Sequence, residues 1–178
     1  MAEQHDESMM NNLYWWGIPT LFRCPHQDLA GSDIALVGVP HSSGNGTTER
    51  DQHLGPRAVR NVSALQRRAH SGFQIDPWEL ATVIDAGDVA FPRANNNEHC
   101  IQQITDYYKK IDSAGVRPVS IGGDHSITYP ILRGIAKKYR PLTILHFDAH
   151  PDLYDEFEGS RLSHACPFAR IMEEGLAT

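Results

Sequence analysis

The chain alternates short apolar runs with segments of helical character, and this order limits the folds that it can adopt. The apolar runs have the length of buried strands and occupy residues 34–39, 81–86, 118–121 and 142–147. The segments of helical character follow them, at residues 58–69, 101–111, 127–135 and 165–174. Because strands that alternate with helices pair in parallel, we predict an α/β fold with a parallel sheet.

We predict a single domain over residues 1–178, with an N-terminal extension at 1–32 and an α/β core at 33–178. The sequence shows no internal repeat and no low-complexity tract that would divide it. The core ends soon after a helical segment, and a parallel sheet of only four strands leaves an unpaired edge. We therefore expect a domain that is incomplete at its C-terminus.

The charge and the N-terminal residues argue against several classes of partner. The formal net charge is −6, and no basic patch indicates binding to nucleic acid or an anionic membrane. No run approaches the ~18 uninterrupted apolar residues of a membrane span. Residues 1–12 lack the basic start and apolar stretch of a signal peptide, and the three cysteines have no paired spacing. We expect a cytoplasmic protein.

Two carboxylates and an imidazole follow the last apolar run. Asp148, His150 and Asp152 are spaced two residues apart, and alternate side chains share one face of an extended chain. Like charges held that close repel each other, and burial increases the repulsion. A divalent cation would compensate them, and open parallel sheets place ligands at the carboxyl ends of their strands.

A second polar cluster, Asp124 and His125, follows the preceding apolar run and a Gly-Gly pair. If the two strands are neighbours, His125 can reach the site that Asp148, His150 and Asp152 form. Asp124 would orient a ligand without binding the ion itself. A donor set of imidazoles and carboxylates without a thiolate favours Mn²⁺, with Ni²⁺, Co²⁺ and Zn²⁺ as alternatives. Carboxylates can bridge, so the site has room for one ion or for two.

These two clusters together resemble the metal motifs of the ureohydrolases, the family of arginases and agmatinases. The similarity covers most of the chain from Ile34 onward and rests on the segments 37–40, 55–57, 122–126, 148–157 and 163–170. The resemblance implies the three-layer αβα fold that arginases share with deacetylases. It also implies a homo-oligomer once the domain is complete.

The resemblance assigns a role to each site residue. His125 and Asp152 would bind one Mn²⁺, His150 would bind the other, and Asp148 would bridge the two ions. The ions would activate water for attack on a guanidinium carbon, with Asp148 stabilising the intermediate. His164 would act as general acid to the departing amine. The products would be urea and an amine.

The substrate expected from the resemblance is a small cationic guanidino compound, with agmatine preferred. Residues 154–159, followed by Ser163 and His164, are similar to the agmatinase and plant-type arginase branches. Arginine, other guanidinoalkyl compounds and guanidine are the alternatives. The segment 41–53 differs from the usual agmatinase sequence and should lie near the mouth of the site, and Pro151 stands where threonine is usual.

Two other interpretations compete with a complete hydrolase. The family finishes its metal site with a Ser-x-Asp-x-Asp segment further along the chain, and no Asp-x-Asp occurs in these residues. The chain would then supply four of six ligands and act as a fragment that binds metal or associates with full-length subunits. A deacetylase with one Zn²⁺ is less consistent with the paired motifs.

Overall fold

The computed structural model describes residues 17–44, 51–65, 69–136 and 141–178. Within these residues, three parallel strands form one sheet in the order β2–β1–β3: β1 (Ile34–Val39), β2 (Val83–Asp88) and β3 (Arg117–Gly122). The central strand β1 pairs with both neighbours, and its Ile34 lies opposite Val83 on one side and Arg117 on the other. The predicted parallel α/β architecture is confirmed.

Four of the described helices, α2, α3, α4 and α6, begin at a capping side chain or at a proline. Asn96 accepts a hydrogen bond from the backbone N–H of His99 at 2.9 Å and so caps the longest helix, α4. No described helix has both the length and the apolar character that crossing a membrane requires. The described helices are α2 (Gly55–Ser63), α3 (Pro77–Leu80), α4 (Asn97–Ser113), α5 (Thr128–Ile135) and α6 (Pro167–Glu173), with 3₁₀ turns η1 (Leu21–Arg23), η2 (Asp51–Leu54) and η3 (His125–Ile127).

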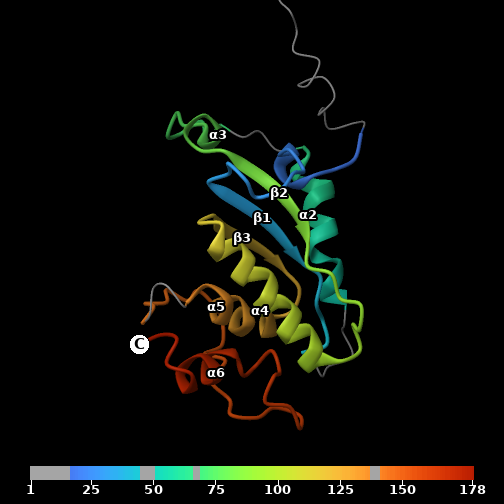
Figure 1. Ribbon diagram of the computed structural model, residues 1–178, viewed down its shortest axis with the longest axis vertical. Helices are drawn as coiled ribbons and strands as arrows, with labels where there is room; N and C mark the ends of the chain where they lie inside the picture. The colour runs from blue at the N-terminus through green and yellow to red at the C-terminus, as the bar shows by residue number, and fades with distance from the viewer. Residues whose placement is uncertain (1–16, 45–50, 66–68, 137–140) are drawn as a thin grey trace, which may run out of the picture.

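The sheet lies between two helical layers (Figure 1). Alternate residues of β1, including Val37 and Val39, share a buried cluster with Ile104 and Tyr108 of α4. The residues between them, such as Leu36, belong to a cluster on the opposite face, toward α2. Full burial of each large apolar side chain contributes about 1.5–3 kcal/mol, so the contacts with α4 stabilise this face of the sheet. The α4 face expected from the sequence is confirmed.

Helix α2 turns a different face to the sheet from the one that its apolar spacing predicted. Val62 and Leu65 are 58% and 62% exposed, whereas the side chain of Arg60 is only 13% exposed. Its guanidinium lies 2.9 Å from Asp85 and 2.7 Å from Asp88, both on β2. Because Asp85 is almost fully buried, its charge needs a partner, and this requirement decides how the helix is oriented. The helix also ends at Ser63 and not near residue 69, although residues 66–68 lie outside the described ranges.

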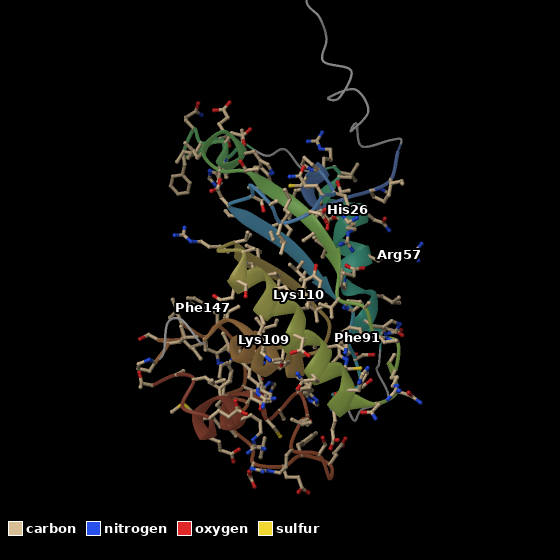
Figure 2. All side chains as sticks on the ribbon, viewed as in Figure 1. His26, Arg57, Phe91, Lys109, Lys110 and Phe147 are labelled. Atoms are coloured by element: carbon tan, nitrogen blue, oxygen red, sulfur yellow. The ribbon has the colours of Figure 1, made fainter. Side chains whose placement is uncertain are left out.

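The fourth predicted strand, residues 142–147, is not a strand in the structure. Only Leu142 forms a bridge, with Ala177, and the rest of the segment has no regular structure. Leu145 and Phe147 are 80% and 87% exposed, and Phe147 lies at the periphery of the molecule (Figure 2). A strand needs a neighbour to satisfy its backbone, and none of the described strands pairs with this segment. The site that was expected on a buried strand end therefore lies on an exposed segment.

The three cysteines are buried in different parts of the fold. Cys24 lies beside α3, where the Trp78 indole N–H donates to its sulfur at 2.9 Å. Cys100 is in the first turn of α4, and Cys166 directly precedes α6. Burial raises the pKa of the Cys100 and Cys166 thiols above the ordinary value. All three thiols are therefore shielded from solvent in the folded chain.

Candidate metal centre

Four side chains bring nitrogen and oxygen donors together beyond the carboxyl end of β3. They belong to His125, His146, Asp148 and Asp152, and we call them the four-donor group. One donor atom from each lies within 4.8 Å of the others. Two imidazoles and two carboxylates are donors that divalent ions such as Mn²⁺ and Zn²⁺ accept, so the residues present fit such an ion. The structure thus brings together three of the four predicted ligands.

His125 reaches the group from a tight turn that follows β3. Gly123 adopts a φ of +73°, and a Cβ there would lie 2.4 Å from the carbonyl oxygen of Val39. Only glycine fits such a position, which explains the second glycine of the Gly-Gly pair. His125 then begins η3, and its Nδ1 contacts a carboxylate oxygen of Asp152 and lies 3.6 Å from one of Asp148. The turn fixes the imidazole relative to the sheet.

The second carboxylate, Asp148, is favoured in its charged form. The backbone N–H of His150 donates to it at 3.2 Å, and Nε2 of His146 lies 3.4 Å from its other oxygen. The hydrogen bond from the His150 N–H, with smaller effects from Ala149, His146 and His125, lowers the pKa of Asp148. An ionised carboxylate is the form that binds a cation. The local backbone therefore prepares Asp148 for this role.

The ring of His150 lies outside the four-donor group, although its sequence spacing suggested otherwise. The expected face required an extended chain, but residues 148–150 form a bend and Asp152 has a φ of +47°. A left-handed residue ends the alternation of side chains that an extended segment would have. His150 is exposed and contributes its backbone N–H to Asp148. Its role as a ligand stays a prediction.

His146 was not among the predicted ligands, yet it belongs to the group. The signal was present in the sequence, because His146 is two residues before Asp148 and continues the same alternation. Its ring centroid lies 4.4 Å from that of Phe168, which is also 5.7 Å from the ring of His125. Phe168, in the first turn of α6, therefore contacts both imidazoles and limits their rotation.

Asp124 is buried. Its carboxylate was expected to contact a metal ligand, but in the structure it binds backbone N–H groups of two loops instead. The backbone N–H of Gly44 donates to one oxygen at 2.9 Å, and the backbone N–H of Ser126 donates to the other at 2.9 Å. Its own N–H donates to the carbonyl of His41. Burial lowers the pKa of the His41 imidazole, and the charge of Asp124 only partly offsets this effect. Asp124 thus organises the backbone on both sides of the site.

His164 contacts the same loop residue as Asp124, Gly44, and it lies outside the four-donor group. Its backbone N–H donates to the carbonyl of Gly44 at 2.9 Å, and its Nδ1 lies 3.1 Å from the same oxygen. Its ring meets that of Phe157 edge to face, with 5.5 Å between centroids. The segment 41–44 therefore lies beside both Asp124 and His164, while residues 45–50 are outside the described ranges.

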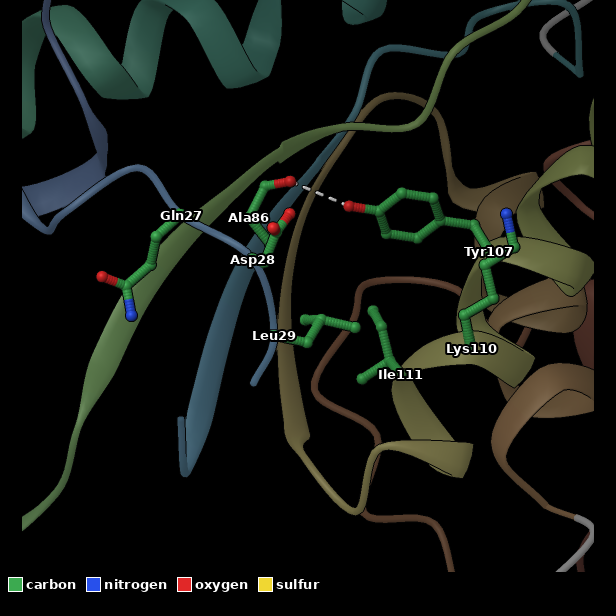
Figure 3. A pocket seen from close by; sticks show the side chains of 7 residues that line it. All are labelled: Gln27, Asp28, Leu29, Ala86, Tyr107, Lys110 and Ile111. Atoms are coloured by element: carbon green, nitrogen blue, oxygen red, sulfur yellow. Dashed lines mark hydrogen bonds between the residues drawn. The ribbon is translucent and has the colours of Figure 1, made fainter. Parts of the chain in front are cut away.

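A separate pocket of about 180 Å³ opens elsewhere on the molecule (Figure 3). Residues 27–29, Ala86 of β2 and three residues of α4 line it. The Tyr107 hydroxyl donates to the carbonyl of Ala86 at 2.9 Å across one side. None of the predicted site residues lines this pocket, which is therefore separate from the four-donor group.

The fold and the site define a three-layer α/β protein with a candidate divalent-metal site beyond the end of a parallel strand. A sequence model of the arginase family matches residues 32–178. The chain belongs to the arginase family. The resemblance of the two metal motifs to ureohydrolases is thereby confirmed at the level of the family.

Individual relatives agree with this assignment. The chain is 40% identical over 162 residues to guanidinopropionase of Pseudomonas aeruginosa, covering 90% of this chain and 50% of that protein. It is 38% identical to a mitochondrial agmatinase of Gallus gallus, covering 90% of this chain and 47% of the relative. A crystal structure titled a hypothetical agmatinase from Burkholderia thailandensis superimposes with a TM-score of 0.84 at 32% identity, over 93% of this chain and 53% of that one. The chain spans about half the length of the curated relatives that it matches.

Proposed function

We propose that these residues form the metal-binding part of a guanidino hydrolase, which converts a guanidino compound to urea and an amine. The observation that carries the proposal is the convergence of His125, Asp148 and Asp152 in a chain of the arginase family. The relatives named guanidinopropionase and agmatinase support the same reaction class. Because the chain spans half of their length, the activity is proposed for the whole domain to which these residues contribute.

We propose Mn²⁺ as the cofactor, two ions per complete site, held in the complete domain by His125, Asp148, Asp152 and His150. In this chain alone, His146 and not His150 is the second imidazole among the converging donors. Bound divalent ions supply Lewis-acid activation of water at neutral pH. Asp148 has one carboxylate oxygen close to both His125 and His146, at 3.6 Å and 3.4 Å, so this oxygen faces the imidazole donors that an ion would share with it. Ni²⁺, Co²⁺ and Zn²⁺ accept the same donors, so metal-dependent assays have to compare them.

His164 is the proposed general acid. An imidazole can both accept and donate a proton, so His164 can take one and pass it to the departing amine nitrogen. Its ring contacts Phe157 and the carbonyl of Gly44, and both contacts hold it on the loop that follows residues 154–159. Positioned acid–base groups contribute about 10²–10⁴-fold to such reactions. Loss of His164 should therefore lower kcat much more than it weakens metal binding.

Agmatine is the proposed substrate. The segment 154–159 carries three acidic residues, Asp155, Glu156 and Glu158, all exposed. Acidic side chains at the mouth of the site would favour the ammonium tail of agmatine over the carboxylate of a guanidino acid. Arg161 and Arg170 pair with Asp155, which leaves Glu156 and Glu158 to carry this preference. Guanidino acids remain the alternative that the guanidinopropionase relative supports.

A hybrid enzyme tests the reaction. Residues 34–178 would replace the matching half of the Pseudomonas aeruginosa guanidinopropionase, and urea release would be measured with Mn²⁺ and agmatine, arginine, guanidinobutyrate or guanidine. We expect urea release, fastest from agmatine, and its loss in the matched Asp152→Asn hybrid. A folded hybrid that binds Mn²⁺ but releases urea from none of the four compounds would contradict the proposal.

The chain by itself is the second candidate, as a metal-binding fragment without turnover. The exposed side chains of Leu145 and Phe147 support it, because they leave the ligand-bearing segment without the packing that an active site requires. We expect this chain to bind Mn²⁺ and to release little or no urea. Full turnover by the chain alone would contradict this expectation.

A cytoplasmic location and a homo-oligomeric complete enzyme belong to the same proposal. The relative from Gallus gallus is named a mitochondrial agmatinase, so a mitochondrial location is the competing outcome. Fractionation of cells that produce the protein would distinguish the two locations. Light scattering would measure the mass of the hybrid, and a monomer would contradict the oligomeric part.

A further inference from the structure

A buried carboxylate joins two loops that carry the candidate chemistry. Asp124 is only 5% exposed, and it directly precedes His125. It accepts hydrogen bonds from the backbone N–H and hydroxyl of Ser126 and, across 80 positions of sequence, from the N–H of Gly44. The same carboxylate that shapes the turn at His125 therefore also fixes the position of Gly44.

Gly44 fits this contact because it has no side chain. A Cβ at this position would lie 2.2 Å from Oγ and 2.4 Å from Cβ of Ser126. Atoms at such distances overlap, so any larger residue would push the loop away from Asp124. The close approach makes Gly44 a fixed point of the backbone, with its N–H committed to Asp124 and its carbonyl directed elsewhere.

The carbonyl of Gly44 faces His164. It accepts from the backbone N–H of His164 at 2.9 Å and lies 3.1 Å from Nδ1 of the ring. A carbonyl oxygen can only accept, so the contact is attractive only when Nδ1 carries a proton. The Ser163 hydroxyl, 3.3 Å from Nδ1, can donate or accept and adapts to either form. In the neutral ring, the lone pair is then on Nε2.

We propose that Asp124 and Gly44 form a positioning link that presents His164 in its Nδ1–H tautomer and leaves Nε2 as the nitrogen that exchanges protons. The catalytic consequence rests on the proposed function, whereas the tautomer does not. In that reaction, the proton lost by the attacking water ends on the nitrogen of the departing amine, and Nε2 carries it. Asp124 and Gly44 act through His164 and touch no reacting atom.

The tautomer can be measured directly in this chain without metal or substrate. Two-bond ¹H–¹⁵N correlation spectra distinguish a protonated Nδ1 from a protonated Nε2, and His164→Gln identifies the signal. At a pH where the ring is neutral, we expect the Nδ1–H pattern for His164. The exposed His150 provides the internal reference in the metal-free chain. A predominant Nε2–H pattern for His164 would overturn the proposal.

Three variants locate the cause. Gly44→Ala should displace the carbonyl and abolish the Nδ1–H preference, and Asp124→Asn should weaken it, since an amide group opposes one of the N–H donors. Ser163→Ala, the matched control, removes the other contact of Nδ1 and should leave the tautomer unchanged. Circular dichroism confirms that each variant folds. An unchanged tautomer in both folded Asp124→Asn and folded Gly44→Ala would contradict the link.

Kinetics in the hybrid enzyme separate this proposal from the proposed function. We expect Asp124→Asn to lower kcat about 100-fold with KM within about twofold, because proton transfer suffers and binding does not. The assays use saturating Mn²⁺, because Asp124 also shapes the turn that carries the metal ligand His125. If the hybrid releases no urea, the proposed function fails while the tautomer measurement still stands. If it releases urea while His164 carries its proton on Nε2, the positioning link fails and the proposed function stands.

Discussion

The sheet half of the molecule, residues 34–122, and the C-terminal segment, residues 141–178, differ in how their side chains are packed. Strand β1 is buried at five of its six residues, whereas Leu145 and Phe147 are mostly exposed. The four-donor group takes His125 from just beyond the sheet and its other three members from the C-terminal segment. The candidate ligands therefore lie where the packed sheet half meets a largely exposed stretch of the C-terminal segment, residues 143–150, and a bound ion would join the two.

Removing a buried charge should break the packed region most severely. Asp85→Ala leaves Arg60 without its main partner inside the sheet half, and uncompensated buried charges cost about 3–5 kcal/mol. We expect the free energy of unfolding, measured by urea denaturation and circular dichroism, to fall by about this amount. A loss below about 1 kcal/mol would contradict this expectation, because it would mean that the sheet half does not depend on the buried ion pair.

Ion binding should stabilise the C-terminal segment more than the sheet half. A ligand that binds only the folded state adds about 2.7 kcal/mol at a hundredfold excess over its Kd. We expect Mn²⁺ to raise stability accordingly and to slow amide hydrogen exchange in residues 146–152 more than in β1. Asp152→Asn should remove both effects. Equal protection of both regions would show that the ion does not act at their junction.

Two single histidine variants distinguish the observed arrangement from the one predicted by sequence spacing. His146→Ala should weaken Mn²⁺ binding by at least about tenfold, equivalent to about 1.4 kcal/mol, because its Nε2 is one of the converging donors. His150→Ala should have a smaller effect, since its ring lies outside the group. Isothermal titration measures both. The reverse order would favour an extended segment like the predicted strand.

Acid should weaken the sheet half through Asp85. Burial alone would raise the pKa of Asp85, but hydrogen bonds from Arg60 and from two backbone N–H groups outweigh it and lower the pKa below its ordinary value. A carboxyl group with a lowered folded pKa contributes stability above its unfolded pKa and loses it as pH falls through the folded one. We expect the urea concentration at the midpoint of unfolding to fall as the pH is lowered below about 4. The Asp85→Asn profile should be flatter.

The smallest effect is expected at the surface of the C-terminal segment. Arg161 pairs with Asp155 and Glu173, but the three side chains are 52%, 76% and 48% exposed. Exposed pairs contribute about 0–1 kcal/mol, so Arg161→Ala should change stability within that range. Arg170→Ala is the matched comparison, because this buried guanidinium also donates to the carbonyls of Asp155 and Arg161. An equal loss in both variants would contradict the reasoning.

The parts of the fold that sequence spacing predicted are those stabilised by local pattern. The apolar run of β1 and the face of α4 that includes Ile104 and Tyr108 were predictable, because burial of a periodic face needs little knowledge of distant contacts. The orientation of α2 was not, since it depends on a carboxylate of β2 that lies 25 positions away from Arg60. The strand at 142–147 failed because pairing requires a neighbour, which no pattern within the segment reveals.

The candidate site shows the same division. Asp148, Asp152 and His125 were predictable from spacing and from the ends of apolar runs. His146 was overlooked although it continues the same alternation, and neither the bend at residues 148–150 nor the left-handed backbone of Asp152 was predictable from spacing. The contact between Gly44 and His164 joins segments 120 positions apart, so only the folded chain reveals it.

Because the three thiols are buried in different parts of the fold, their labelling rates can report on local opening of the structure. An alkylating reagent can reach Cys24, Cys100 or Cys166 only when the surrounding structure opens, so the labelling rate at each position measures how often that part opens. Cys166 would report on the C-terminal segment and Cys100 on α4. Mass spectrometry of labelled peptides could then rank the opening free energies of the parts within one unmodified protein.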